Sequence, residues 1–262
     1  MSEPVRLACT VDDGPAGAPV LVLGNSLGTT SELWLPQLAT FRKHFRVVQY
    51  EHRGHGRSPA PAGGYTLAEL GGDVLRLLDE LGTGPVAYCG VSLGGMIGMW
   101  LAANAPDRIS TLAVLCTTAR MPDQAFWIDR AARVRASGLA PLAGGVVGRW
   151  FTPAFAARDP ATPARFIATL TSDVDPAGYA GCCDAIAAMD LLPALPAVTA
   201  PTLVIAGSED PATPPWLGAV IARAIPDARL RVIRGASHLA NVSQPSEVTV
   251  ALTSHLLAAR GG

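Results

Sequence analysis

The feature that most constrains this chain is the stretch Pro85–Gly95, PVAYCGVSLGG. A short apolar run leads into Gly-Val-Ser-Leu-Gly, and small residues then open a segment of helical composition. A serine on a sharp turn between a strand and a helix has strained backbone, and only small residues two positions to either side avoid collisions. Gly90 and Gly94 meet that need around Ser92. The stretch therefore predicts strand, tight turn and helix with an exposed serine hydroxyl, although a glycine-rich turn with an incidental serine would also fit the pentapeptide.

Apolar runs of strand length recur along the chain and alternate with helix-like segments. Near-continuous apolar runs indicate strands buried on both faces, as in parallel sheets covered by helices. Between them, Leu67–Leu81 has apolar residues three and four apart, the spacing of an amphipathic helix. The predicted strands are 19–23, 46–50, 86–89, 112–116, 202–206 and 230–233. We therefore expect an α/β fold with a mainly parallel sheet flanked by helices.

The alternation stops between residues 118 and 200, where no strand-like run occurs. Prolines interrupt the helix-like pieces of this segment at Pro122, Pro141, Pro153, Pro160, Pro163 and Pro176. We interpret residues 118–200 as a helical cap, or lid, inserted into a core made of residues 1–117 and 201–262. A cap over the carboxyl ends of the strands would cover the place where open α/β sheets bind ligands, so it would help to select the substrate.

Charge, hydropathy and cysteine usage exclude several classes of function. The 20 basic and 21 acidic residues leave a formal charge of −1, which argues against a nucleic acid partner. The N-terminus lacks a signal-peptide pattern and no apolar run approaches the ~20 residues of a membrane span, so we expect a cytoplasmic protein. The five cysteines include no Cys-x-x-Cys pair, and we interpret them, Cys182 and Cys183 included, as reduced packing residues. We expect neither a metal nor a cofactor.

Two later segments supply partners for the serine. A serine hydroxyl becomes an effective nucleophile when a base takes its proton and an acid orients that base. The strand-like run TLVIAGSED ends at Asp210, and the loop after RVIRGAS carries His238. Serine, acid and histidine in that order is the arrangement of α/β-hydrolases. Ser92, Asp210 and His238 are therefore the predicted catalytic residues, with Glu209 as the competing acid.

The resemblance to α/β-hydrolases extends along nearly the whole chain, and several stretches resemble the 3-oxoadipate enol-lactonase family more specifically. They are NSLGTT (25–30), EHRGHGRS (51–58), CGVSLGGMIGMWLA (89–102), FWIDRAARVRASGL (126–139) and GYAGCCDAIAAMDL (178–191). The last two lie in the predicted cap, whose sequence tends to differ between substrates. His52 and His55 with Glu51 could suggest a metal site, but the same glycine-rich turn occurs in metal-free hydrolases.

The resemblance implies a small anionic substrate, an enol-lactone with a free carboxylate, opened by water to 3-oxoadipate in the protocatechuate branch of the β-ketoadipate pathway of aromatic degradation. It also implies an oxyanion hole made by the backbone N–H groups of Leu27 and Leu93. Where many relatives carry His-Gly before the first donor, this chain has Asn25-Ser26. Since some members are fused to a decarboxylase domain, such a domain is a candidate partner. The oligomeric state and the preferred lactone isomer stay open.

A substrate carboxylate needs a cation, and the cap offers several on one expected helix. Arg130 and Arg133 share a face at i, i+3, and Trp127 lies one step back on it. We expect Trp127 to form a pocket wall and Arg130 or Arg133 to bind the carboxylate, because a guanidinium can hold it with two hydrogen bonds. The alternative is a solvated arginine face over a packed tryptophan. Trp34 and Trp150 are weaker pocket candidates.

Two other functions fit parts of the sequence. One is a carboxylesterase or cofactor-free haloperoxidase-like hydrolase with the same catalytic residues, which a pocket without a fixed cation would favour. The other is a non-catalytic protein that binds a small molecule on the same fold, which a complete set of catalytic residues does not favour.

Overall fold

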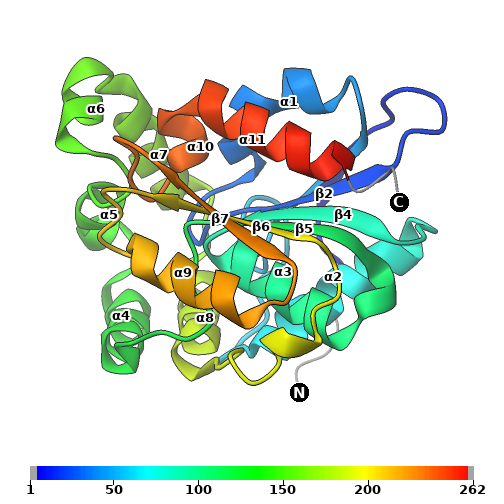
Figure 1. Ribbon diagram of the computed structural model, residues 1–262. Helices are drawn as coiled ribbons and strands as arrows, with labels where there is room; N and C mark the ends of the chain where they lie inside the picture. Colours follow the sequence, from blue (N-terminus) through cyan, green and yellow to red (C-terminus); the bar gives the residue numbers. More distant parts are fainter. Residues whose placement is uncertain (1–4, 259–262) are drawn as a thin grey trace.

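The computed structural model describes residues 5–258, and a seven-stranded sheet runs through its centre (Figure 1). The strands lie in the order β1-β3-β2-β4-β5-β6-β7, with β1 antiparallel to β3 and every other neighbouring pair parallel. Their bounds are β1 Cys9–Asp12, β2 Val20–Gly24, β3 Arg46–Tyr50, β4 Val86–Val91, β5 Ile109–Leu115, β6 Thr202–Gly207 and β7 Ala228–Ile233. The prediction of a mainly parallel sheet is confirmed.

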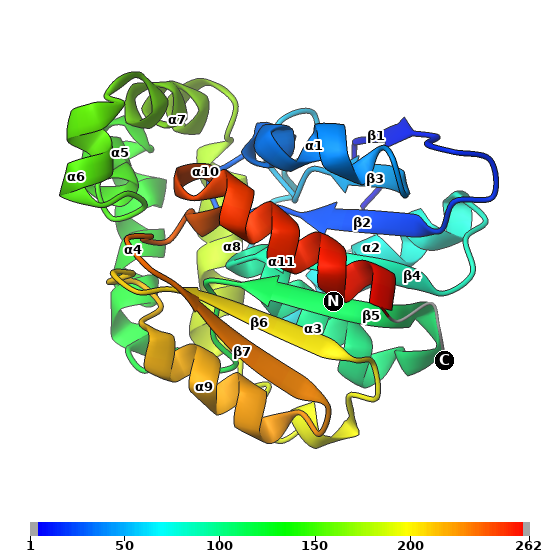
Figure 2. The same ribbon diagram turned by 45° about the horizontal axis from the view of Figure 1, so that its top comes forward.

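Helices cover both faces of the sheet, which is why the central strands are apolar along their length (Figures 1 and 2). On one face lie α1 (Leu35–Phe41), α10 (Ala240–Ser243) and α11 (Pro245–Ala258). On the other lie α2 (Leu67–Glu80), α3 (Leu93–Asn104) and α9 (Pro215–Ala224). Every residue of β4 and of β6 is buried. No helix within the described residues is long and apolar enough to cross a bilayer.

Helix α2 shows how local sequence sets an element's start. Thr66 accepts a hydrogen bond from the Glu69 N–H, and the Glu69 side chain accepts one from the Thr66 N–H. This reciprocal cap satisfies two N–H groups that a helix start leaves without intrahelical acceptors. The apolar positions seen in the sequence then face the sheet, with Leu70, Val74 and Leu77 buried.

The segment between β5 and β6 is helical throughout its regular part. Its helices are α4 Gln124–Ser137, α5 Ala140–Val147, α6 Pro153–Arg158, α7 Ala161–Ser172 and α8 Pro176–Ala188. They gather beyond one end of the sheet (Figure 2). Three of the six prolines that interrupt the sequence pattern, Pro141, Pro153 and Pro176, stand in the first turn of α5, α6 and α8, where a missing N–H costs no hydrogen bond. The boundaries of a separate cap at 118 and 200 stay a prediction.

Strand β1 is absent from the sequence prediction. Its four residues, CTVD, are half-buried or exposed and lie at the sheet edge beside β3. An edge strand of this length needs no apolar run, so no hydrophobic pattern marks it.

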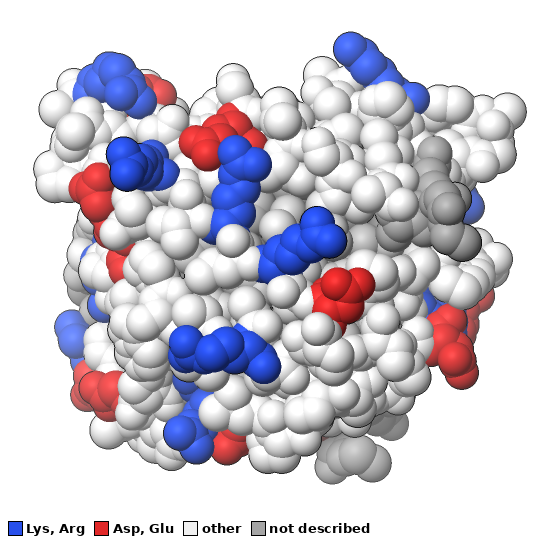
Figure 3. All heavy atoms as spheres, viewed as in Figure 1, with Lys and Arg blue, Asp and Glu red and all other residues white. Residues whose placement is uncertain are grey.

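Charged side chains are dispersed over the surface: Figure 3 shows Lys and Arg separated by uncharged residues, with Asp and Glu among them. This face presents no continuous basic surface of the kind that binds phosphates.

Candidate active site

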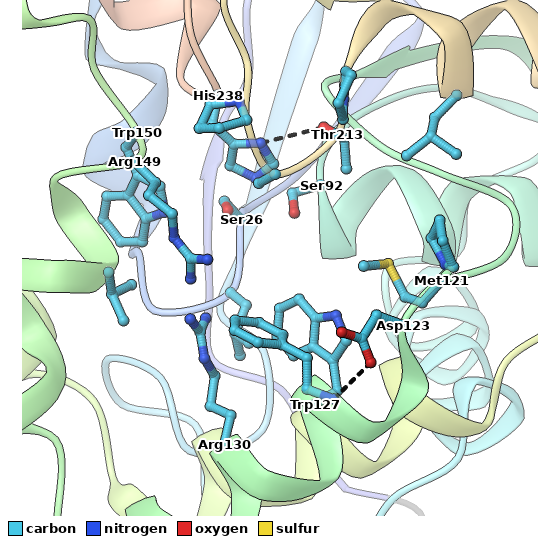
Figure 4. Close-up of a pocket in the computed structure, with 18 of the residues that line it drawn as sticks. Ser26, Ser92, Met121, Asp123, Trp127, Arg130, Arg149, Trp150, Thr213 and His238 are labelled. Carbon is cyan, nitrogen blue, oxygen red and sulfur yellow. Dashed lines mark hydrogen bonds between the residues drawn. The ribbon is translucent and has the colours of Figure 1, made fainter.

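Ser92 stands at the turn between β4 and α3 in the conformation that the sequence predicts. Its φ of 53° is positive, which is rare for a residue with a side chain. A Cβ at Gly90 would lie 2.3 Å from the Gly94 carbonyl carbon, and one at Gly94 would lie 2.4 Å from the Gly24 carbonyl oxygen. Both glycines are therefore required by close backbone approach, and the turn directs the Ser92 hydroxyl toward the cavity (Figure 4).

His238 and Asp210 form a buried pair beside this serine. The His238 Nδ1–H donates to Asp210 Oδ2 at 2.8 Å, which leaves Nε2 as the ring nitrogen free to act on a hydroxyl. Ser92 and His238 line the same cavity (Figure 4). Glu209, the competing acid, has an exposed side chain on the neighbouring position. The geometry thus brings together the three residues that the sequence singles out.

Asp210 is held as a carboxylate by more than the histidine. The Ala212 and Thr213 N–H groups donate to Oδ1 at 2.8 and 3.0 Å, and the Thr213 hydroxyl donates to Oδ2 at 2.6 Å. Burial alone would raise the pKa of the Asp210 carboxyl, but the charge of His238 and the hydrogen bonds from His238 and Thr213 lower this pKa to about 2. Thr213 was not predicted from the sequence, and it also lines the cavity.

The two expected oxyanion donors flank the serine. Leu93 is the first residue of α3, where an N–H has no intrahelical acceptor. Leu27 lines the cavity from the turn after β2, and the Gly94 N–H donates to the Asn25 carbonyl at 2.9 Å, tying that turn to the serine's own. This arrangement suits the backbone donors for a carbonyl oxygen that becomes negative.

The cavity has a volume of about 270 Å³, and its far wall comes from the helices between β5 and β6. That wall holds Trp127 and Arg130 from α4, and Trp150 beside it. Trp34 is instead fully buried in the core. Ligand pockets usually have about 300–1,000 Å³, so a cavity just below this range suits a small substrate.

Of the arginines expected to bind a carboxylate, only Arg130 reaches the cavity. The Arg133 side chain is 61% exposed and points to Asp129, 3.8 Å away. The reason is the rotation of α4, which buries Ala131 and Val134 and leaves position 133 facing solvent. The spacing predicts a shared face for the two arginines, but it does not predict which part of that face meets the cavity.

A second arginine, Arg149, was missed by sequence reasoning. It projects from the segment after α5 so that its guanidinium faces that of Arg130 (Figure 4). The Phe126 ring lies 4.5 Å from the Arg130 guanidinium carbon and 5.0 Å from that of Arg149. Burial and the charge of Arg130 lower the pKa of Arg149. Within residues 5–258 neither arginine forms an ion pair, and the one hydrogen bond that Arg130 makes there is a long one of 3.5 Å to the Tyr179 hydroxyl. Asp123 also lines the cavity, but its carboxylate accepts a hydrogen bond from the Phe126 N–H at the start of α4 and pairs with neither arginine.

Comparison with known proteins agrees with this geometry. The model of the alpha/beta hydrolase fold matches residues 19–245. The chain is 40% identical to 3-oxoadipate enol-lactonase 2 of Acinetobacter baylyi over 88% of this chain and 86% of that protein. The crystal structure of the enol-lactonase from Burkholderia xenovorans LB400 superposes with a TM-score of 0.93 at 40% identity, covering 97% of both chains. This chain belongs to the enol-lactonase family of α/β-hydrolases.

The same fold extends to an esterase. The structure of a thermophilic esterase from Thermogutta terrifontis superposes on this hydrolase with a TM-score of 0.90 at 28% identity, over 97% of this chain and 94% of the other. The relatives are enzymes that act on ester bonds, which makes this chain an ester or lactone hydrolase and argues against a non-catalytic binding protein. What separates a lactonase from an esterase on one fold is the cavity wall rather than the catalytic residues.

Proposed function

We propose that this hydrolase opens 3-oxoadipate enol-lactone to 3-oxoadipate, in the protocatechuate branch of aromatic degradation, through an acyl-enzyme on Ser92. The observation that carries the proposal is the pair of guanidiniums, Arg130 and Arg149, that face the cavity while no carboxylate of the described residues, Asp123 included, forms an ion pair with either. A neutral ester leaves both charges uncompensated, whereas a substrate carboxylate gives them an anion to bind.

The first half of the reaction transfers the acyl group to the enzyme. Ser92 Oγ attacks the lactone carbonyl while His238 Nε2 takes the hydroxyl proton, and Leu27 and Leu93 N–H groups bind the resulting oxyanion. When the tetrahedral intermediate collapses, the bond between the carbonyl carbon and the ring oxygen breaks. The ring oxygen leaves as an enolate, which is a better leaving group than an alkoxide and needs less help from a general acid.

The second half releases the product. His238 takes a proton from water, the water oxygen attacks the acyl carbon, and the ester bond to Ser92 breaks as the Ser92 oxygen regains a proton. Because the lactone is cyclic, the enol stays attached to the acyl group and could close the ring again. Its conversion to the ketone, by protonation at carbon, removes that nucleophile and makes the hydrolysis one-directional.

The test compares two substrates with wild-type enzyme and Ser92→Ala. Hydrolysis of 3-oxoadipate enol-lactone is followed by loss of ultraviolet absorbance, with p-nitrophenyl acetate as a neutral ester. We expect fast turnover of the lactone that depends on Ser92, and slow turnover of the ester. Ester turnover without lactone turnover would contradict the proposal and favour the carboxylesterase alternative.

A further inference from the structure

The Ser26 hydroxyl is a polar group of the cavity to which the proposed reaction gives no role. Ser26 is 1% exposed, yet it lines the cavity, and Figure 4 shows its side chain beside Ser92 and His238. Its carbonyl oxygen accepts hydrogen bonds from the Thr29 N–H at 3.1 Å and the Thr29 hydroxyl at 2.8 Å. The Ser26 hydroxyl itself has no hydrogen-bond partner among residues 5–258. Since Ser26 lines the cavity and its hydroxyl oxygen is not among the sealed polar atoms of the described residues, a group bound there can accept a hydrogen bond from it.

The turn that carries Ser26 is held rigidly from the side away from the cavity. The Asn25 carbonyl accepts a hydrogen bond from His52 Nε2–H at 2.7 Å, and the Asn25 amide donates to the Tyr50 carbonyl at 2.9 Å. On the other side of Ser26, the Gly28 N–H donates to His55 Nε2 at 2.9 Å. Hydrogen bonds at Asn25 and at Gly28 therefore hold the backbone of the turn on both sides of Ser26, and the Ser26 side chain lines the cavity.

The tautomer of His55 follows from its two hydrogen bonds. Its Nδ1 is 2.9 Å from the Arg53 carbonyl, which can only accept, so the ring proton sits on Nδ1. Nε2 is then a free acceptor for the Gly28 N–H, and burial, the main cause, lowers the pKa of His55 to about 4. The histidine is therefore neutral at physiological pH and keeps the turn in place during turnover.

The group in front of the turn is the oxyanion. Ser26 directly precedes Leu27, so only a few covalent bonds separate the Ser26 hydroxyl from the Leu27 N–H. An oxyanion bound to that N–H therefore lies within reach of the hydroxyl in one of the staggered rotamers of Ser26. We propose that the Ser26 hydroxyl donates a third hydrogen bond to the oxyanion, beside the N–H groups of Leu27 and Leu93. This inference rests on the proposed acyl-enzyme mechanism. It predicts a residue that acts on every substrate attacked by Ser92, whether or not the substrate has a carboxylate.

The experiment uses Ser26→Ala, with Ser26→Cys as a variant that keeps the shape of the side chain, is somewhat larger, and weakens the donor. Each is assayed with the enol-lactone and with p-nitrophenyl acetate, and inhibition by phenylboronic acid reports binding of a tetrahedral adduct on the serine. Removing one oxyanion donor typically lowers kcat by about 10²-fold or more. We expect Ser26→Ala to lower kcat for both substrates by about that factor, with Ser26→Cys between it and wild type, and to weaken the boronic acid.

A structural role would give a different result. Ser26→Ala removes a hydroxyl without an internal partner, so the melting temperature should stay the same or rise. The matched control is Ser243→Ala, a buried serine whose hydroxyl donates to the Leu239 carbonyl at 3.2 Å, and it should lower stability while leaving kcat unchanged.

Three results would overturn the inference: Ser26→Ala within twofold of wild type on both substrates, a loss confined to the lactone, or a loss of activity that follows a fall in melting temperature. Failure of the proposed function would give other results: Ser92→Ala would still hydrolyse the lactone, or wild-type enzyme would not hydrolyse it.

Discussion

Replacing Arg149 by methionine should weaken recognition of the carboxylate and leave the chemistry intact. Its guanidinium faces that of Arg130 on the same cavity wall, and within the described part of the chain neither forms an ion pair (Figure 4). A hydrogen bond to a charged group contributes about 1.5–3 kcal/mol, and about 1.4 kcal/mol corresponds to a tenfold change. We therefore expect Arg149→Met to lower kcat/KM for the enol-lactone by about 10- to 100-fold, mainly through KM.

Arg130→Met should give a loss of similar size. The double variant should lose less than the product of the two factors if one carboxylate contacts both arginines, because the two sites then share a ligand. The assay is the ultraviolet absorbance of the lactone over a range of concentrations, and p-nitrophenyl acetate is measured with the same enzyme samples. The ester lacks a carboxylate, so its kcat/KM should stay within about twofold of wild type in all three variants.

The matched control comes from the same helix. Arg133 lies three residues after Arg130, but its side chain is 61% exposed and pairs with Asp129. Arg133→Met removes one positive charge from the same helix, as Arg130→Met does, but from its solvent-exposed side. We therefore expect no change in lactone kinetics. The reasoning would be refuted if Arg133→Met lowered kcat/KM as much as Arg130→Met, or if the arginine variants lost the ester and the lactone equally.

Three further predictions concern the catalytic pair, the core and pH. Asp210→Asn should lower kcat by roughly 10⁴-fold because the amide cannot hold the His238 tautomer, and a loss under tenfold would contradict this. Asp73→Ala should lower the free energy of unfolding by about 3–5 kcal/mol in urea titrations, since it leaves Arg53 as a buried charge without the carboxylate 2.5 Å away, and a cost below 1 kcal/mol would argue otherwise. Burial lowers the pKa values of His52 and His55 to about 3 and about 4, so the unfolded chain binds more protons below pH 6.5 and stability falls as the pH drops toward 4. The loss should be roughly 2 kcal/mol per histidine at pH 5, and His55→Gln should flatten the slope of stability against pH; an unchanged slope would show that another group causes it.

The sequence predicts most of the sheet because burial on both faces leaves a signature in the amino acids. Strands β4 and β6 are buried at every position, and both appear as continuous apolar runs. Ser92 is equally visible, since the strained turn needs glycine at fixed spacing. Strand β1 leaves no such signature because none of its four residues is buried: each is half-buried or exposed.

The cavity wall could be predicted only in part, because it is assembled from elements far apart in the chain. Trp127 and Arg130 lie three residues apart on one helix, and this spacing predicts that they share a face. The rotation of that helix depends on its packing against the rest of the fold, which decides between Arg130 and Arg133. Arg149 follows another helix and has no periodic relation to either, so only the folded chain brings it to the same wall.

If Ser92 carries the acyl group during turnover, the intact mass of the protein records it. Wild-type enzyme is mixed with an excess of enol-lactone and quenched with acid within milliseconds, and the intact mass of the protein is measured by mass spectrometry. Since the leaving enolate stays attached to the acyl group, we predict an added mass equal to the whole lactone, located on the Ser92 peptide and absent in Ser92→Ala. An adduct on another residue, or lactone turnover by Ser92→Ala at the wild-type rate, would contradict the account.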